Sequence, residues 1–302
     1  MDILITGSSG FVGKNLLSYL IGKDLSCTVI SRESLQDPKL EKFNEKEAII
    51  HLAGKAHDLK SVSDPQEYYK VNYELTKELY NSFIESDIKK FIFISSVKAI
   101  ADQVPEILTE DADPNPQTHY GKSKLMAEKY IQSMPLPEGK SFYVLRPCMI
   151  HGPGNKGNLN LLYNFVKRGI PYPLAGFRNK RSFLSVQNLC FIINELIIRN
   201  DIPSGVYQVA DDESLSTNDV VTILAASLNT KPRLWKISPR LVKFIAKIGD
   251  IIPFPLSSER LNKLTESYVV SNKKIRSVIG KKLPLTATEG LKFTAISFNE
   301  FD

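Results

Sequence analysis

Tyr120 and Lys124 are the residues of this sequence whose types and spacing best suit proton transfer. Two side chains four residues apart on a helix lie on the same face. A phenol is a poor base at neutral pH because its ordinary pKa is about 10, but an ammonium held nearby favours the phenolate. The same spacing is common on the surfaces of amphipathic helices, so the surrounding residues must decide its meaning.

Two hydroxyl side chains stand where they could meet that tyrosine. Ser95 and Ser96 end the apolar run 90–96, and Ser96 precedes Tyr120 by 24 residues. We expect this run to be a buried strand. A hydroxyl at the carboxyl end of a strand can bond the oxygen that a tyrosine protonates, so a serine, a tyrosine and a lysine would form a proton relay.

A glycine pattern near the start of the chain suits a phosphate. Gly7, Gly10 and Gly13 follow the short apolar run 3–5 at intervals of three, and apolar residues then recur at helical spacing. The pattern predicts a strand, a tight turn and a helix, which is the first half of a β-α-β unit. Such a turn lets a phosphate approach the N–H groups at the start of the helix.

The elements that must position these residues alternate along the chain. Further strands are expected at 27–31, 48–54, 90–96 and 141–147, and helices over roughly 66–86 and from near residue 120. This alternation predicts an α/β fold, a Rossmann-type doubly wound parallel sheet, over residues 1–150. Residues 151–302 are expected to form a smaller mixed α/β lobe that mainly binds substrate, with some segments returning to the first domain.

Composition narrows the class of function. The 302 residues are 42% hydrophobic and 24% charged, as in ordinary globular proteins. The net charge of +6 is not concentrated in a long Lys/Arg block, so we expect no nucleic-acid partner; an anionic small substrate accounts for the excess equally well. We expect no metal, because the three cysteines form no C-x-x-C pair and the four histidines have no ligand spacing.

The sequence also indicates whether the protein spans or touches a membrane. It contains neither a recognisable signal segment nor a run of about 20 apolar residues, so we expect a cytoplasmic protein without stable membrane insertion. The stretch 235–256 is basic and amphipathic and could touch a membrane surface. We favour the simpler interpretation, a helix of the substrate lobe that packs its apolar face.

Taken together, the motifs resemble those of the extended short-chain dehydrogenases/reductases, in the branch of sugar-nucleotide epimerases, dehydratases and reductases. TGSSGFVG is similar to the family's T-G-x-x-G-x-x-G, and YGKSK to its Y-x-x-x-K. HLAG, KVNYELT, LRPCMIHGPG and KRSFLSVQNL resemble further family motifs in the family's order. The resemblance covers nearly the whole chain.

The resemblance implies roles for particular residues. Ser96, Tyr120 and Lys124 match the catalytic hydroxyl, the acid or base and the assisting amine, and Asn72 matches an asparagine that steadies the active-site helix. The implied cofactor contacts are Gly7, Gly10, Phe11, Val12, Gly13, Ser31, Arg32, Leu52, Ala53, Gly54, Asn72, Tyr120 and Lys124.

Three further residues are candidate substrate contacts. Arg181 matches an arginine that contacts the nucleotide diphosphate, a task that suits a guanidinium because it can bond two phosphate oxygens at once. Asn158 is a candidate for phosphate or sugar contact, and Ser95 for contact beside Ser96. The family also implies a homodimer.

The end of the second expected strand bears on the choice of cofactor. An acidic residue there would bond the adenosine ribose and repel a 2′-phosphate. This chain has Ser31 and Arg32 instead, with Glu33 one position later. Arg32 can neutralise a 2′-phosphate, which slightly favours NADP over NAD, although an arginine can also stack on adenine.

The two residues after Ser96 narrow the range of reactions that the sequence allows. The family's 4,6-dehydratases carry an Asp-Glu pair there, whereas this chain has Val97 and Lys98, which disfavours water elimination. We favour reduction of a UDP-4-keto-6-deoxy-N-acetylhexosamine for surface polysaccharide synthesis. The alternative is 4-epimerisation of a UDP-hexose or UDP-N-acetylhexosamine, and a lesser one is a catalytically silent NADP-binding regulator.

Overall fold

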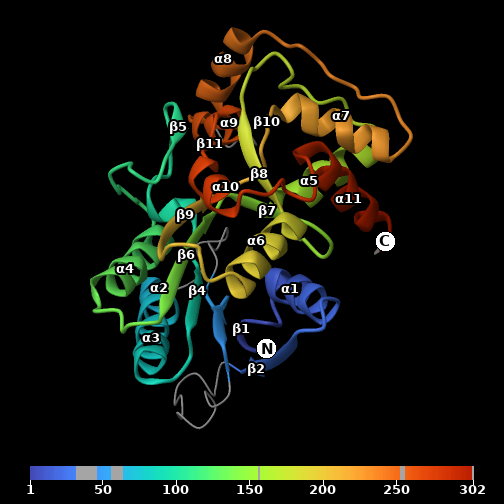
Figure 1. Cartoon of the computed structure of the whole chain (residues 1–302). Coiled ribbons are helices and arrows are strands. Elements are labelled where there is room, and N and C mark those ends of the chain that lie inside the picture. Colours follow the sequence, from blue (N-terminus) through green and yellow to red (C-terminus); the bar gives the residue numbers. More distant parts are fainter. Residues whose placement is uncertain (32–45, 56–63, 156, 252–255, 301–302) are drawn as a thin grey trace.

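A parallel six-stranded sheet forms the base of the molecule (Figure 1). The computed structural model describes residues 1–31, 46–55, 64–155, 157–251 and 256–300. The sheet has the order β2-β1-β3-β4-β6-β9, and every neighbouring pair in it is parallel. Its strands are β1 (Asp2–Thr6), β2 (Ser26–Ile30), β3 (Ala48–His51), β4 (Lys90–Ile94), β6 (Ser141–Pro147) and β9 (Gly205–Val209). The Rossmann-type fold expected from the sequence is confirmed.

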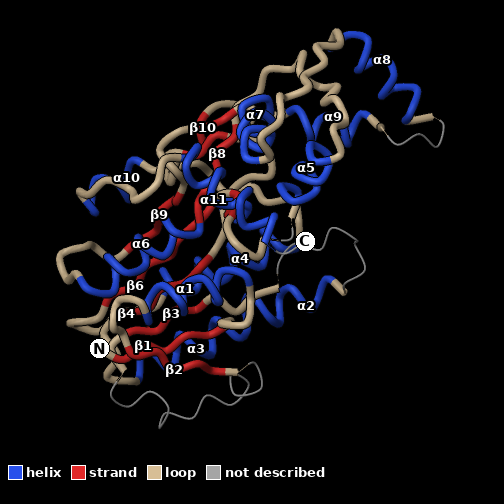
Figure 2. Tube along the Cα trace, turned by 90° about the vertical axis from the view of Figure 1, so that its right-hand side faces the viewer, coloured by secondary structure: helices blue, strands red, loops and turns tan. Residues whose placement is uncertain are grey.

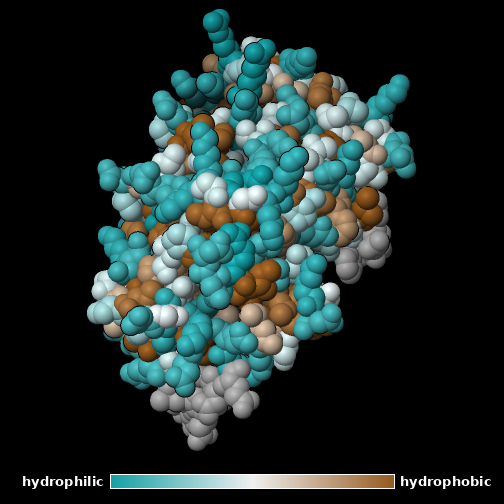
Figure 3. Space-filling view, viewed as in Figure 1, coloured by the Kyte–Doolittle hydropathy of each residue, from teal (hydrophilic) through white to brown (hydrophobic). Residues whose placement is uncertain are grey.

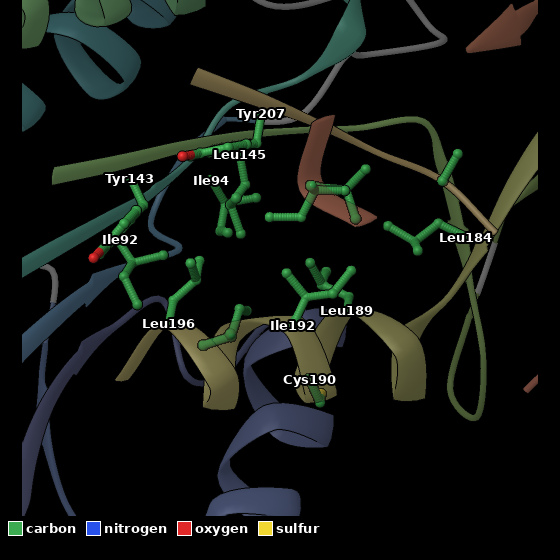
Figure 4. Close-up of a cluster of buried hydrophobic side chains, with 14 of the residues drawn as sticks. Ile92, Ile94, Tyr143, Leu145, Leu184, Leu189, Cys190, Ile192, Leu196 and Tyr207 are labelled. Carbon is green, nitrogen blue, oxygen red and sulfur yellow. The ribbon is translucent and has the colours of Figure 1, made fainter. Parts of the chain in front are cut away.

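Helices cover both faces of this sheet because its strands are apolar on both sides. Alternate residues of a strand point to opposite faces, so Ile3 and Ile5 pack with α1 (Phe11–Ile21) and α6 (Val186–Ile198), while Leu4 packs with α3 (Leu75–Glu85) and α4 (His119–Ser133). Figure 4 shows part of the apolar cluster between the sheet and α6. The side chains that the sheet contributes face those of α6: Ile92, Ile94, Tyr143, Leu145 and Tyr207 on one side, Leu189, Ile192 and Leu196 on the other.

The helix expected over 66–86 is not regular. It consists of α2 (Pro65–Tyr69), a π-helical turn η2 (Lys70–Glu74) and α3. Such turns are frequent at functional sites, and this one carries the fully buried Asn72.

The second lobe is built from small sheets and short helices. One sheet has the order β10-β8-β7, with β7 (Met149–His151) parallel to β8 (Arg181–Ser185) and β10 (Ser214–Leu215) antiparallel to it. The other pairs β5 (Ile107–Leu108) with β11 (Val269–Val270). The remaining elements are the 3-10 turn η3 (Val97–Ala99), α5 (Asn158–Lys167), α7 (Thr217–Ser227), α8 (Pro239–Gly249), α9 (Ser258–Thr265), α10 (Lys273–Ile279) and α11 (Ala287–Glu300).

The two lobes interleave along the chain. Both α6 and β9 follow residue 150, yet they pack on and pair within the six-stranded sheet. Across the part of the chain that the structure describes, no helix is long and apolar enough to cross a bilayer.

Candidate active site

The glycine turn lies at the carboxyl end of β1, and its close packing requires the absence of side chains. Gly7 has a φ of +73°, and a Cβ on it would lie 2.6 Å from the backbone nitrogen of Ala53. A Cβ on Gly13 would lie 2.3 Å from the carbonyl oxygen of Gly7. The turn therefore holds α1 against β1 and against the residues Leu52 and Ala53 that follow β3.

The start of α1 is the part of this turn that stays open. Gly10 is the exposed N-cap residue, no side chain caps the helix, and a Cβ there would approach only the Gly7 oxygen, at 3.3 Å. A helix N-terminus of this kind binds phosphate through its N–H groups and its dipole. Gly10, Phe11 and Val12 therefore fit the pyrophosphate of a dinucleotide.

The loop after β7 adjoins this start of α1. Asn15 Nδ2 donates to the carbonyl oxygen of Pro153 at 3.1 Å. A Cβ on Gly152 would lie 3.6 Å from the Phe11 ring. The loop after β7 thus borders the proposed cofactor site.

Ser96 and Tyr120 meet at the carboxyl edge of the sheet. Ser96 follows β4 and caps η3, and its side chain hydrogen-bonds the phenol of Tyr120. Tyr120 is the second residue of α4, whose N-cap Thr118 accepts from the Gly121 N–H at 3.1 Å. The structure thus brings together the hydroxyl and the acid or base that the sequence pairs.

Lys124 lies one turn along α4, with a fixed side chain. Its Nζ donates to the carbonyl oxygen of Ile94 at 2.9 Å and lies 4.7 Å from the centroid of the Phe93 ring. A Cβ on Gly54 would lie 3.1 Å from this Nζ and 3.0 Å from Asn72 Oδ1, so the glycine allows close packing against the buried amine.

Burial sets the protonation states of the two groups. It lowers the pKa of Lys124 from 10.5 to about 8, and it raises the pKa of Tyr120 above its ordinary value. The hydrogen bond from Ser96 opposes the shift of the tyrosine. Burial thus opposes the phenolate that the ammonium of Lys124 is expected to favour.

Asn72 acts on the backbone of this site. It is fully buried, its Oδ1 accepts from the Lys55 N–H at 2.7 Å, and its Nδ2 donates to Lys55 O at 3.1 Å and Ser123 Oγ at 3.0 Å. Ser123 in turn donates to the carbonyl oxygen of Tyr120 at 2.8 Å. Asn72 thus ties the segment after β3 to the first turn of α4, which makes it a positioning residue. Sequence reasoning missed Ser123, whose only signal is its place inside the Y-x-x-x-K pattern.

A buried histidine continues this network to the glycine turn. His51 Nε2 lies 2.9 Å from Thr76 Oγ1, whose hydroxyl donates to Asn72 O, and its Nδ1 lies 2.7 Å from Thr6 Oγ1. Burial lowers the pKa of His51 to about 3, so the ring is neutral. Nε2 then donates to Thr76 and Nδ1 accepts from Thr6, an internal structural role rather than a catalytic one.

Ser95 lies in a different environment from the one expected. Its side chain is 3% exposed and its hydroxyl donates to the carboxylate of Glu128. Glu128 is fully buried and accepts from Arg146 Nε at 3.0 Å and Nη2 at 2.6 Å. Successive side chains leave a strand on opposite sides, so Ser96 faces Tyr120 while Ser95 is committed to this buried ion pair. The geometry gives no support to Ser95 as a substrate contact.

Arg181 lies beside Tyr268, a residue that contacts η3 and the segment after it. It begins β8, is half-buried, and its Nε donates to Glu266 O at 3.2 Å. Its backbone pairs with that of Tyr268, whose ring lies 4.3 Å from Lys98 Nζ and whose hydroxyl donates to Ala101 O. Lys98 thus contacts Tyr268 through its side chain, and Arg181 does so through its backbone. Arg181 Nη2 lies 4.0 Å from Glu266 Oε1. No sequence motif pointed to Tyr268.

Of the remaining candidates, the structure describes Asn158 and Ser31, and both are exposed. Asn158 is exposed at the first turn of α5. Ser31 is exposed directly after β2, and Arg32 falls outside the described residues. Val97 is 4% exposed within the large apolar cluster, so the position where a dehydratase carries a carboxylate is part of the core. Among the described residues, no group of His, Cys, Asp and Glu could hold a metal ion.

Comparisons with known proteins agree with this geometry. Residues 3–210 match the profile of the NAD dependent epimerase/dehydratase family. The chain belongs to this family. It is 31% identical over 319 residues to a UDP-glucose 4-epimerase of Vibrio cholerae, covering 98% of this chain and 95% of the relative. It is 31% identical over 210 residues to a GDP-6-deoxy-D-talose 4-dehydrogenase of Aggregatibacter actinomycetemcomitans, covering 65% and 70%.

A solved structure supports the fold. The UDP-N-acetylglucosamine 4-epimerase of Bacillus cereus superposes with a TM-score of 0.79 at 18% identity, over 99% of both chains. Relatives of the chain are nucleotide-sugar 4-epimerases, 4-dehydrogenases and reductases, and the protein is an NAD(P)-dependent enzyme of this family.

The glycine after Tyr120 should be needed for the position of the tyrosine. A Cβ on Gly121 would lie 2.3 Å from Lys98 O and 2.9 Å from Pro116 Cβ, which pushes the first turn of α4 away from η3. We expect Gly121→Ala to lower kcat by about 10- to 100-fold, because small displacements of a reacting group are costly. Gly22→Ala, whose Cβ would meet its nearest atom at 3.4 Å, is the control; an unchanged kcat in Gly121→Ala would contradict the packing argument.

The burial of the Lys124 amine should make the free energy of unfolding depend on pH. Because the pKa of Lys124 is about 8 in the folded protein and 10.5 ordinarily, the unfolded chain holds more protons between these values. Raising the pH through this window therefore stabilises the folded state. We expect the unfolding free energy of wild type minus that of Lys124→Met to rise from about pH 8 to 10.5. The same difference taken with Lys129→Met, an exposed lysine of α4, should stay flat.

Proposed function

We propose that the enzyme is a 4-epimerase of a nucleotide-linked hexose or N-acetylhexosamine, with UDP as the nucleotide. The observation that carries this is the extent of similarity. The 4-epimerase relative matches almost the full length of both chains, including the substrate lobe, whereas the 4-dehydrogenase matches about two thirds of each. The preference drawn from the sequence, a 4-ketoreductase, thus becomes the second candidate.

The side chains of the site can serve both halves of an epimerisation. NAD(P), when bound, would take a hydride from C4 of the sugar and return it. Tyr120 would remove the proton of the C4 hydroxyl as the ketone forms and give it back as the ketone is reduced, with Ser96 bonding the same oxygen. Lys124 would hold the ribose hydroxyl beside the phenol. No further acid is needed, which agrees with Val97 and Lys98 after the catalytic serine.

The diphosphate of the substrate would bind between the lobes. Arg181 and Lys98 interact electrostatically, and burial lowers the pKa of both, which an arriving anion would offset. The start of α5 with Asn158 offers a helix N-terminus to the same ligand.

One observation favours the second candidate, reduction of a UDP-4-keto-6-deoxy-N-acetylhexosamine. Burial raises the pKa of Tyr120, which favours the neutral phenol, the state that donates a proton to a ketone. A reductase consumes one NAD(P)H for each product, whereas an epimerase returns the hydride to the same sugar.

The test uses the purified full chain and NMR of the sugar. We expect UDP-glucose or UDP-N-acetylglucosamine to be converted to its C4 epimer until equilibrium, with no net change in absorbance at 340 nm. Stoichiometric NADPH oxidation that occurs only with a 4-keto sugar would favour the reductase. Tyr120→Phe controls for contaminating activity.

We propose NADP as the slightly preferred cofactor, and Arg32 provides the test. Arg32→Asp should weaken NADP binding far more than NAD binding, since it removes a positive charge and places a carboxylate where a 2′-phosphate would lie. Fluorescence titration of both cofactors measures the two affinities. Lys23→Asp, at an exposed lysine beyond α1, is the charge-matched control. Equal losses for both cofactors in Arg32→Asp would show that Arg32 does not bind that phosphate. A homodimer and a cytoplasmic location remain predictions.

A further inference from the structure

Helix α8 leaves most of its apolar surface uncovered. The sequence favoured a helix that packs its apolar face, but only Val242 and Ala246 are buried, against the cluster that includes Tyr172 and Leu261. Leu241, Phe244 and Ile248 are 52%, 61% and 40% exposed. They lie three, four and seven residues apart, so they form a single stripe along the helix.

Basic side chains border this stripe. At 100° per residue, Arg240, Lys243 and Lys247 fall between the exposed stripe and the far side of the helix, and all three are exposed. The segment 231–251 contains six Lys or Arg and one Asp, a net +5 out of the chain's +6. The rest of the protein is therefore close to neutral, and the net positive charge comes from the segment that contains α8.

The position of α8 leaves it accessible. Figure 2 shows the helix at the end of the molecule opposite β2, projecting beyond α7 and α9. The hydropathy surface shows hydrophilic and hydrophobic residues mixed over the end that carries α8 (Figure 3). Trp235, before the helix, and Ile251, after it, are further exposed apolar residues, at 59% and 86% exposure.

We propose that this surface, residues 235–251, docks the enzyme on an anionic phospholipid bilayer. An amphipathic helix with aromatic and aliphatic residues on one side and Lys/Arg beside them lies in the headgroup region without spanning the membrane. Clustered cations are drawn to the negative surface potential of anionic lipids. A second copy of the chain is a poorer occupant, because a two-fold interface through this surface would place like charges against one another. The inference does not depend on the proposed reaction.

The experiment is flotation of the full-length protein with vesicles of phosphatidylcholine alone or with 30% phosphatidylglycerol added, roughly the charge of anionic membranes. We expect wild type to float with the anionic vesicles, with little on phosphatidylcholine, and to be released as salt rises. Phe244→Ser/Ile248→Ser should reduce the bound fraction by roughly tenfold or more, and Arg240→Gln/Lys247→Gln should do the same at physiological salt.

Matched controls distinguish vesicle binding by this surface from nonspecific binding and from the effects of misfolding. Phe293→Ser/Ile296→Ser changes the same residue types at exposed positions of α11, and Lys273→Gln/Lys282→Gln removes two exposed cations elsewhere. Both should float as wild type does, and all variants should keep the wild-type Tm. Failure of wild type to float, or equal flotation of the α8 variants, would overturn the proposal. Loss of a dimer in Phe244→Ser/Ile248→Ser without any vesicle binding by wild type would assign the surface to a second copy instead.

Discussion

Replacing Tyr120 by phenylalanine is expected to lower kcat by roughly 10²–10⁴, the range for a lost acid or base. The ring and its packing against Tyr68 remain, so affinity for NAD(P) should be nearly unchanged. The substitution removes only the hydroxyl group that hydrogen-bonds with Ser96. Steady-state kinetics with a cofactor titration measure both quantities.

A tyrosine on the same helix supplies the control. The Tyr130 hydroxyl donates to Asn81 at 2.6 Å, away from Ser96, so Tyr130→Phe should keep kcat near that of wild type. Activity of Tyr120→Phe within a factor of two of wild type would show that the relay is assigned to the wrong residues.

Loss of the buried carboxylate of Glu128 should have the largest effect on stability. Glu128→Ala leaves the guanidinium of Arg146 and the hydroxyl of Ser95 buried without their acceptor. An uncompensated buried charge costs about 3–5 kcal/mol, which is on the order of 10²–10³ or more in the unfolding equilibrium. Denaturant unfolding measures the loss.

Two further variants separate burial from charge pairing. Glu259→Ala removes the exposed partner of Lys263 and should change stability little. Glu128→Leu/Arg146→Met replaces both charges by apolar groups and should recover much of the loss. A Glu128→Ala protein as stable as wild type would contradict the account of this ion pair.

Patterns that are local in sequence made the framework of the site predictable. The glycine turn is specified by three glycines and the strand before them, and the pairing of Tyr120 with Lys124 by helical spacing. Ser96 could be placed near them because carboxyl ends of parallel strands share one edge of the sheet. The β-α alternation likewise sufficed for the Rossmann-type sheet.

Contacts between segments that are distant along the chain could not be predicted from the sequence. The link from Asn72 through Ser123 to α4 joins residues 51 positions apart, and Tyr268 reaches Ala101 across 167 positions. The resemblance singled out Ser96, but the buried contact of Ser95 with Glu128 could not be foreseen, because one residue of register decides which face each side chain takes. The pKa of Tyr120 depends on burial more than on the charge four residues away, and burial is a property of the folded chain.

The most direct measurement of the central claim follows the hydrogen at C4 of the sugar. A UDP-sugar carrying deuterium at C4, incubated with the enzyme until its epimer appears, should keep that deuterium at C4 of both sugars, because the hydride leaves and returns to the same carbon. Retention with no net change in absorbance at 340 nm is the predicted result. Exchange of the deuterium with solvent, or product formed only with stoichiometric consumption of NAD(P)H, would contradict the proposal.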